Sequence, residues 1–311
     1  MSASEPSWAL FEAFVAVMTT GSLSAAARAM RVAQPTVRRQ IEQLEEELGV
    51  VLFTRATNGL VPTELARTTM PYAESIAAGA RAFVRALSAP ASAERGTVRI
   101  TCSDIVGAEV LPPMLVALHE SHPDIQIELA LTNRNEDLLR RDADIAIRMV
   151  EPTQQGLVRR RATRIELGLF ATREYLERHT PPRRLADLSE HVLIGPDRER
   201  AVFEILGKLG LPSTPRHYLL RCDADLAKVA AVRAGLGVGI CQVPLSRTPV
   251  ALVRVLPSFL VHLDAWVTMH EDLRDVRRIR VVFDHLVTAL ERYGADASPA
   301  RRRSVRLDRS S

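Results

Sequence analysis

The segment that most constrains the fold is residues 21–62, GSLSAAARAMRVAQPTVRRQIEQLEEELGVVLFTRATNGLVP. Ser22 is placed to cap a short helix, whose small alanines let a second helix pack closely against it. Pro35 suits the first turn of that second helix, because its missing N–H would have no partner there. Gly49 then ends the helix, and Asn58-Gly59 is typical of a hairpin turn. This order of helix, turn, helix and hairpin predicts a winged helix-turn-helix, and therefore a DNA-binding unit.

The second helix of this unit has one apolar and one polar face. Apolar residues recur at steps of four, three and four, which predicts a face directed into a small core: Val37, Ile41, Leu44 and Leu48. The opposite face carries donors suited to phosphates and to base edges in a major groove. An amphipathic helix pair with a solvated charged face is the alternative interpretation. The residues expected to contact DNA are Ser22, Gln34, Pro35, Thr36, Arg38, Arg39, Arg55 and Asn58.

Charge is informative through its position. Residues 1–94 hold eight arginines and nine acidic residues, so this part of the chain is not basic overall. Because DNA affinity depends on neutralising phosphates, the positive charges must be clustered at the binding surface. Residues 295–311 hold five arginines against two aspartates and few large apolar residues, which predicts a disordered basic tail. That tail either adds nonspecific attraction to DNA or is a solvated terminus.

Composition excludes several classes of protein. A chain of 311 residues with 47% hydrophobic residues is ordinary for a globular protein with two or three cores. It contains no membrane-length apolar stretch, and its start does not resemble a secretion signal, so we expect a cytoplasmic protein without a membrane partner. Its cysteines, Cys102, Cys222 and Cys241, are too few and too scattered for a disulfide framework or a zinc site. We therefore expect no metal and no cofactor.

Residues 63–87 follow as one long amphipathic helix. Apolar and mostly small residues recur along it at alternating intervals of four and three, which is a heptad pattern: Ala66, Met70, Ala73, Ala77, Ala80, Val84 and Leu87. These residues are predicted to form a dimerisation seam, and packing of the helix on its own domain is the alternative. The Pro/Ala/Ser-rich residues 88–95 predict a hinge.

The run FEAFVAVMTTGSLSAAARAMRVAQPTVRRQIEQLEEELGVVLFTR resembles the N-terminal domain of the LysR-type transcriptional regulators nearly position by position, and the resemblance continues to about residue 294. The resemblance implies a homodimer or homotetramer that binds double-stranded promoter DNA and contacts RNA polymerase. The family commonly has Ser at the position of Arg38 and Gly at that of Ala66. Arg38 could read guanine or hold a phosphate, so the preferred DNA site is expected to differ from the usual interrupted palindrome of the family.

Beyond the hinge, strands are expected at residues 96–102, 125–131 and 144–149, with a helix at 110–119. Strands that alternate with helices predict an α/β domain with a mostly parallel sheet. The resemblance implies a two-lobed effector-binding domain of the periplasmic-binding-protein type over residues 96–294. One lobe would combine residues 96–165 with 268–294, and the other would hold residues 166–267.

A small-molecule effector is expected between those lobes, because ligands of open α/β sheets bind beyond the carboxyl ends of the strands. Hydroxyls and a guanidinium there would suit a carboxylate. A structural ion pair, for example with Glu151, is the alternative role for Arg148. The predicted effector residues are Ser103, Asp104, Thr132, Asn133, Arg148, Ile194, Gly195, Cys222 and Asp223.

Three other functions fit the sequence less well than a regulator. An α/β enzyme with an appended DNA-binding module is not supported by any catalytic triad, metal cluster or phosphate loop. The glycines at 235–239 are expected to form a tight helix-to-strand connection and not a nucleotide site. A thiol-based redox sensor is disfavoured because Asp223 opposes a thiolate at Cys222 and Cys241 lies in an apolar strand. A solute-binding protein would carry a signal peptide. The sequence therefore predicts a LysR-type regulator, and not an enzyme.

Overall fold

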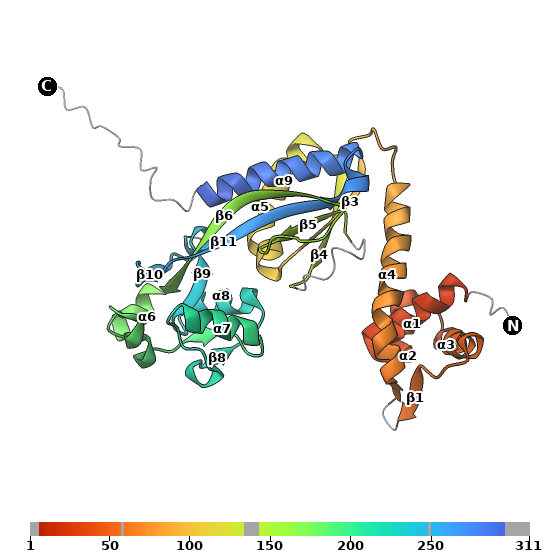
Figure 1. The fold of residues 1–311 in the computed structure, drawn as a ribbon, viewed down its shortest axis with the longest axis horizontal. Helices are drawn as coiled ribbons and strands as arrows, with labels where there is room; N and C mark the ends of the chain where they lie inside the picture. Colours follow the sequence, from red (N-terminus) through yellow and green to blue (C-terminus); the bar gives the residue numbers. More distant parts are fainter. Residues whose placement is uncertain (1–5, 57–58, 134–142, 248–249, 296–311) are drawn as a thin grey trace. The chain divides into compact units, whose positions relative to one another are not determined.

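The computed structural model describes residues 6–56, 59–133, 143–247 and 250–295. The chain forms two compact units (Figure 1). Unit 1 comprises the described residues up to Pro90, and unit 2 comprises the described residues of Ala91–Asn133 and from Asp144 onward. Among the described residues, no helix has both the length and the apolar character needed to cross a membrane.

Unit 1 contains the elements predicted for a winged helix-turn-helix. Three short helices precede a two-stranded antiparallel hairpin, and a longer helix follows it. Ser22 caps the second helix, since its hydroxyl accepts a hydrogen bond from the backbone N–H of Ala25 at 3.2 Å. The elements are α1 (Trp8–Thr20), α2 (Leu23–Met30), α3 (Gln34–Leu48), β1 (Phe53–Ala56), β2 (Gly59–Pro62) and α4 (Glu64–Ala86).

The apolar face predicted for α3 is shorter than expected. Val37, Ile41 and Leu44 are buried in the core of unit 1, whereas Leu48 is 43% exposed. Gly49 ends α3 with a positive φ of 67°, and the chain then brings Leu52 into the core. The prediction for Leu48 was wrong because periodicity along a helix does not show where the core beneath it ends.

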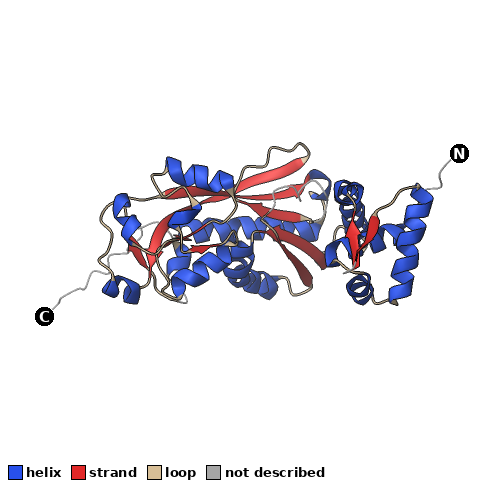
Figure 2. Cartoon of the chain, turned by 90° about the horizontal axis from the view of Figure 1, so that it is seen from below, coloured by secondary structure: helices blue, strands red, loops and turns tan. Residues whose placement is uncertain are grey.

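Unit 2 is built around a seven-stranded mixed sheet. Its strand order is β10-β6-β11-β5-β3-β4, and β9 also pairs with β6. Strands β3, β4 and β5 are parallel to one another, but β11 is antiparallel to both β5 and β6, and β9 and β10 are antiparallel to β6 (Figure 1). The prediction of a mostly parallel sheet was therefore wrong, because the pattern of short strands and helices does not show how the later strands return to the sheet. Figure 2 shows the strands in red and the helices around them in blue. The strands are β3 (Gly96–Cys102), β4 (Ile125–Leu131), β5 (Ile145–Arg148), β6 (Leu157–Ala171), β9 (Gly239–Gln242), β10 (Val253–Val255) and β11 (Val261–His270).

Helices cover this sheet and connect it to a small parallel pair of strands, β7 (Ile194–Gly195) and β8 (Leu220–Arg221). The predicted helix at 110–119 is α5 (Leu111–Ser121), preceded by a π-helical turn over Val106–Val110. The other helices are α6 (Arg173–Arg178), α7 (Arg200–Lys208), α8 (Asp225–Arg233) and α9 (Arg277–Ala295), with 3-10 turns at Leu185–Glu190, Pro215–His217, Pro244–Ser246 and Glu271–Leu273.

Two hydrophobic cores stabilise unit 2. One joins the β3–β5 strands to α5 and α9, and the other surrounds Tyr175 and Phe203. The glycine-rich segment connects α8 to β9, with Gly235 at a positive φ of 77°, so it is the helix-to-strand connection that was predicted. Burying these apolar side chains is the main force that holds the strand ends in place.

Candidate DNA-binding surface and effector cleft

The exposed face of α3 presents the side chains predicted to contact DNA. Pro35, Thr36, Arg38 and Arg39 are exposed, and Gln34 is half-buried. Neither Arg38 nor Arg39 forms an ion pair with any residue that the structure describes, and the same holds for Arg28 and Arg31 nearby. Their guanidinium groups are therefore free to bind phosphates or guanine edges.

Arg31 forms the turn between α2 and α3. Its φ of 56° lies in the left-handed region, and its backbone N–H bonds to the carbonyls that end α2. This position favours glycine, because a side chain costs energy at positive φ. An arginine here places a positive charge at the helix-turn-helix.

Glu45 holds the hairpin against α3, a role that was not predicted. Its carboxylate accepts hydrogen bonds from the backbone N–H groups of Leu52 at 2.6 Å and Phe53 at 2.9 Å. The sequence shows Glu45 only as one of several acids in the later turns of the helix. Its contact with residues seven and eight positions away carries no local sequence signal.

The hairpin β1–β2 corresponds to the predicted wing. Arg55 lies in β1, where its backbone pairs with Leu60. The side chain of Arg55 lies outside the described part of the structure. Residues 57 and 58, which include Asn58, lie outside it as well.

Helix α4 uses part of the predicted seam within its own unit. Ala66 and Ala73 are buried in the core of unit 1, and Met70 packs against that core. Ala77 is buried as well, Ala80 is half-buried, and Val84 and Leu87 are exposed. The alternative interpretation, packing on the same domain, therefore holds for the first half of the seam.

A different face of α4 carries exposed large apolar residues. Tyr72 is 73% exposed and Phe83 is 66% exposed, and Leu65 and Ile76 are also exposed. These four residues are spaced at steps of seven, four and seven, which is the spacing of a coiled-coil seam. We call this set the α4 stripe. The sequence pattern alone did not distinguish it from the alanine-rich face beside it.

The predicted effector residues at the ends of β3 and β4 lie together. The side-chain oxygen of Asn133 accepts from the backbone N–H of Asp104 at 3.3 Å, and the Asn133 amide donates to the Asp104 carboxylate at 3.4 Å. Ser103 and Thr132 are half-buried at the same edge, where the N–H of Thr132 bonds to the carbonyl of Cys102. This edge is the candidate effector cleft.

Arg148 is turned inward. It is 5% exposed, and its guanidinium donates to the hydroxyl of Thr101 at 3.1 Å and to the carbonyl of Ile147 at 3.0 Å. The sequence left two roles for this guanidinium open, pairing with a ligand carboxylate or a structural ion pair, and these two hydrogen bonds are to neutral oxygens of the protein. The side chain points inward because Arg148 ends a strand whose four residues are all buried.

The predicted effector residues of the second group lie in or directly after two short strands. Ile194 and Gly195 form β7, and Cys222 and Asp223 follow β8. The Asp223 carboxylate accepts from the backbone N–H groups of Asp197 and Arg198. Burial raises the pKa of this carboxyl, but these hydrogen bonds outweigh burial and hold it below its ordinary value. Asp223 therefore anchors the loop before α7.

Two of the cysteines are unsuited to redox sensing. Burial raises the pKa of the Cys102 thiol to about 12, although Arg148 acts in the opposite direction, and burial raises that of Cys241 to about 12. A sensor thiol requires the thiolate. Within the described residues, no group of three or more histidine, cysteine or acidic side chains is arranged to hold a metal ion.

Comparison with known families agrees with this geometry. Residues 8–67 match the family described as bacterial regulatory helix-turn-helix protein, lysR family, and residues 91–291 match the LysR substrate binding domain. The chain belongs to the LysR family. The relatives that it matches are named as transcriptional regulators, so the predicted LysR-type regulator is confirmed at this level.

Relatives of this LysR-family protein align along most of its length. It is 27% identical to the probable regulator LtrA of Klebsiella pneumoniae over 88% of this chain and 91% of that protein. It is 24% identical to the transcriptional activator TtdR of Escherichia coli K12 over 90% of this chain and 93% of that protein.

Solved structures support the fold. Full-length AphB of Vibrio cholerae superposes with a TM-score of 0.61 at 21% identity, covering 90% of this chain and 98% of AphB. Full-length CbnR in complex with its target DNA has a TM-score of 0.61 at 20% identity, covering 91% of this chain and 99% of CbnR.

Proposed function

We propose that this LysR-family regulator binds promoter DNA through residues 1–62, with the N-terminal half of α3 in the major groove. The observation that carries the proposal is the group of exposed arginines on α2, the turn and α3, which have no ion-pair partners among the described residues. CbnR, which shares the fold, has been solved with its target DNA. Of the predicted contacts, Ser22 would act by capping α2 and orienting its backbone.

We further propose that the protein acts as a homodimer or dimer of dimers in which the α4 stripe of one chain packs on that of another. Tyr72, Ile76 and Phe83 would bury large apolar surfaces that are exposed in the single chain. Two DNA-binding units held together in this way would bind two half-sites, which increases affinity through effective concentration.

The effector is proposed to bind at the edge formed by Ser103, Thr132 and Asn133. These residues offer hydroxyl and amide groups, which orient a polar ligand. A carboxylate is the first class to test, although both terminal guanidinium nitrogens of Arg148, on which that class was predicted, donate to oxygens of the protein. The effector response would be transmitted by the linker helix at residues 63–87 and the hinge at residues 88–95. One lobe of the effector-binding domain would combine residues 96–165 with 268–294, and the other would hold residues 166–267. RNA polymerase as a partner and the cytoplasm as location are proposed from family membership alone.

The test is a DNA mobility shift with purified full-length protein and the intergenic DNA upstream of its own gene. We expect specific binding at nanomolar to micromolar concentrations at moderate salt. Equal binding to random DNA of the same length would refute the proposal.

Arg38→Ala separates base recognition from phosphate contact. If Arg38 reads a base, the substitution reduces the preference for the specific site by about 5- to 100-fold and relaxes the sequence requirement at one position. If it holds a phosphate, all sequences weaken alike and the salt dependence becomes shallower by about one charge. Arg67→Ala, an exposed arginine of α4 outside the helix-turn-helix, is the matched control.

A further inference from the structure

The two groups of predicted effector residues meet at the start of α8. The Oδ2 atom of the Asp104 carboxylate accepts a hydrogen bond from the backbone N–H of Leu226 at 3.4 Å, although the two residues are 122 positions apart. The sulfur of Cys222 accepts a hydrogen bond from the backbone N–H of Ala224 at 3.4 Å. The edge beyond β3 and the residues that follow β8 therefore both contact the same helix end.

This helix end has no cap from the residue that precedes it. That residue is Ala224, whose methyl group cannot accept a hydrogen bond, and it provides no side-chain cap. The first N–H groups of a helix have no partner within the helix, and together with the helix dipole they attract an anionic group. Asp104 supplies that group from a distant part of the chain. A carboxylate of the protein thus lies where the acid group of a ligand would bind.

Asp104 is held in position by further contacts. Its Oδ1 atom accepts hydrogen bonds from the backbone N–H of Ile105 at 2.8 Å and from the side-chain amide of Asn133 at 3.4 Å. The far end of α8 is tied to the same segment of unit 2, because Arg233 pairs with Glu109. Contacts within the protein therefore fix the carboxylate against the helix end.

The negative charge of Asp104 has no cationic partner among the described residues. The described groups that donate to its carboxylate are neutral, namely two backbone amides and one side-chain amide. Arg148, the cation predicted at this edge, is buried, and both its terminal nitrogens donate to oxygens of the protein. A second carboxylate placed beside Asp104 would be repelled, because like charges close together in a partly buried site interact unfavourably.

We propose, on the basis of the effector site proposed above, that Asp104 decides which ligands the cleft accepts. Its carboxylate takes the place of a ligand acid group, so the cleft rejects anionic ligands and selects neutral or cationic ones. Removal of the Asp104 carboxylate leaves the N–H groups of Ile105 and Leu226 without their acceptor. A small free carboxylate would then bind in its place.

The first experiment replaces the Asp104 carboxylate by a free one in the full-length protein. Asp104→Ala removes the carboxylate and keeps Cβ, so formate fits the vacated space. We expect the substitution to lower the Tm, and about 100 mM formate to raise the Tm of the variant by about 2 to 5 °C more than the same concentration of chloride. Asp104→Asn removes the charge but fills the space. Neither this variant nor the wild-type protein should respond to formate beyond the effect of chloride.

Amide hydrogen exchange locates the rescue. Exchange at the start of α8 should be faster in Asp104→Ala than in the wild-type protein, and formate should slow it again. Asp225→Ala is the matched control, since it removes a carboxylate of the same helix turn that pairs with Lys228. Formate should not change exchange in this control.

Two results of these measurements would overturn the proposal. One is a formate effect on Asp104→Ala that does not exceed its effect on Asp104→Asn. The other is equal exchange at the start of α8 in Asp104→Ala and the wild-type protein. If Asp104→Ala does not fold in chloride, the yield of folded protein after refolding in formate and in chloride gives the same comparison, and equal yields overturn the proposal.

The second experiment tests the cleft of the wild-type protein by isothermal titration calorimetry with acetate, succinate and benzoate. We expect no saturable binding of these carboxylates at the cleft. A carboxylate that binds the wild-type protein at millimolar concentration, and no longer binds Ser103→Ala/Thr132→Val, would overturn the selection by Asp104 and leave the proposed effector site intact. An effector response that survives Ser103→Ala/Thr132→Val would instead refute the effector site and leave the result with formate standing.

Discussion

Arg233, at the end of α8, donates two hydrogen bonds to the Glu109 carboxylate at 2.8 and 2.9 Å, which joins α8 to the π-helical turn before α5. Arg233 also donates to the carbonyl of Leu245. At the start of the same helix, the N–H of Leu226 bonds to the Asp104 carboxylate at 3.4 Å. Both ends of α8 are therefore fixed to the segment that contains the cleft residue Asp104.

Glu109→Gln should destabilise unit 2, because the guanidinium of Arg233 would lose its charged partner. The side chain of Glu109 is only 23% exposed and that of Arg233 only 12%, so water replaces the lost interaction poorly. We expect a loss of about 2 kcal/mol, or a decrease in Tm of roughly 4 to 8 °C, measured by differential scanning calorimetry. The control Glu204→Gln breaks the pair with Arg200, in which both side chains are largely exposed. It should change the Tm little. Equal Tm values for the two variants would contradict the prediction.

Glu45→Ala should destabilise unit 1 and weaken DNA binding together. The substitution leaves the backbone N–H groups of Leu52 and Phe53 without their acceptor, at a cost of about 1 to 3 kcal/mol. Chemical denaturation and the DNA mobility shift measure the two effects. Glu46→Ala, in the same helix but exposed, is the matched control. If both variants unfold at the same denaturant concentration, the Glu45 contacts do not stabilise the hairpin.

Tyr72→Ser/Phe83→Ser should dissociate the protein without unfolding it. Both side chains are exposed in the single chain, so their loss removes surface only from the proposed dimer. Sedimentation velocity should show a shift to smaller species, and DNA affinity should fall by about 100-fold or more as the two half-sites are bound independently. Arg67→Ser, exposed elsewhere on α4, should leave the assembly intact. An unchanged sedimentation coefficient in the double variant would exclude the α4 stripe as the interface.

The stability of unit 2 should fall as the pH decreases below the ordinary pKa of histidine, about 6.5. Burial lowers the pKa of His191, and the neighbouring His179, whose ring centroid lies 6.3 Å away, lowers it further. The unfolded chain therefore takes up a proton at a higher pH than the folded chain, which favours unfolding until the pH falls below the lowered pKa. His191→Gln should reduce this slope in denaturation curves recorded between pH 8 and pH 5. Identical slopes in the two proteins would show that His191 does not contribute.

The winged helix-turn-helix was predicted in detail because its signals are local. The cap at Ser22, the positive φ at Gly49 and the periodicity of α3 each depend on a few neighbouring residues. The parallel strands and the helix-to-strand connection at Gly235 followed from similar short patterns. The family resemblance supplied the order of the larger parts.

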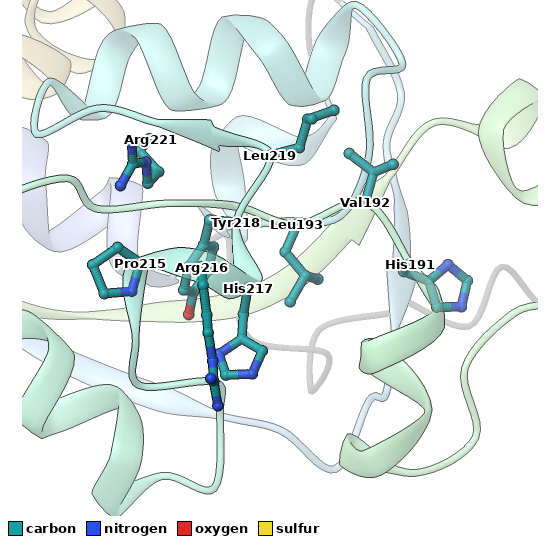
Figure 3. A pocket seen from close by; sticks show the side chains of 9 residues that line it. All are labelled: His191, Val192, Leu193, Pro215, Arg216, His217, Tyr218, Leu219 and Arg221. Atoms are coloured by element: carbon teal, nitrogen blue, oxygen red, sulfur yellow. The ribbon is translucent and has the colours of Figure 1, made fainter.

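Long-range contacts determined what the sequence left open. The heptad pattern of α4 fits two adjacent faces, and only the packing of Ala66 and Ala73 in the core leaves Tyr72 and Phe83 exposed. Arg148 donates a hydrogen bond to Thr101 on a neighbouring strand. The pocket lined by residues 191–193, 215–219 and 221 joins segments more than twenty residues apart (Figure 3). The sequence by itself thus determined the elements and the family, because capping, turns and periodicity act within a few residues. The tertiary structure decided which side chains are buried, paired or available to a partner, because burial depends on residues distant in the chain.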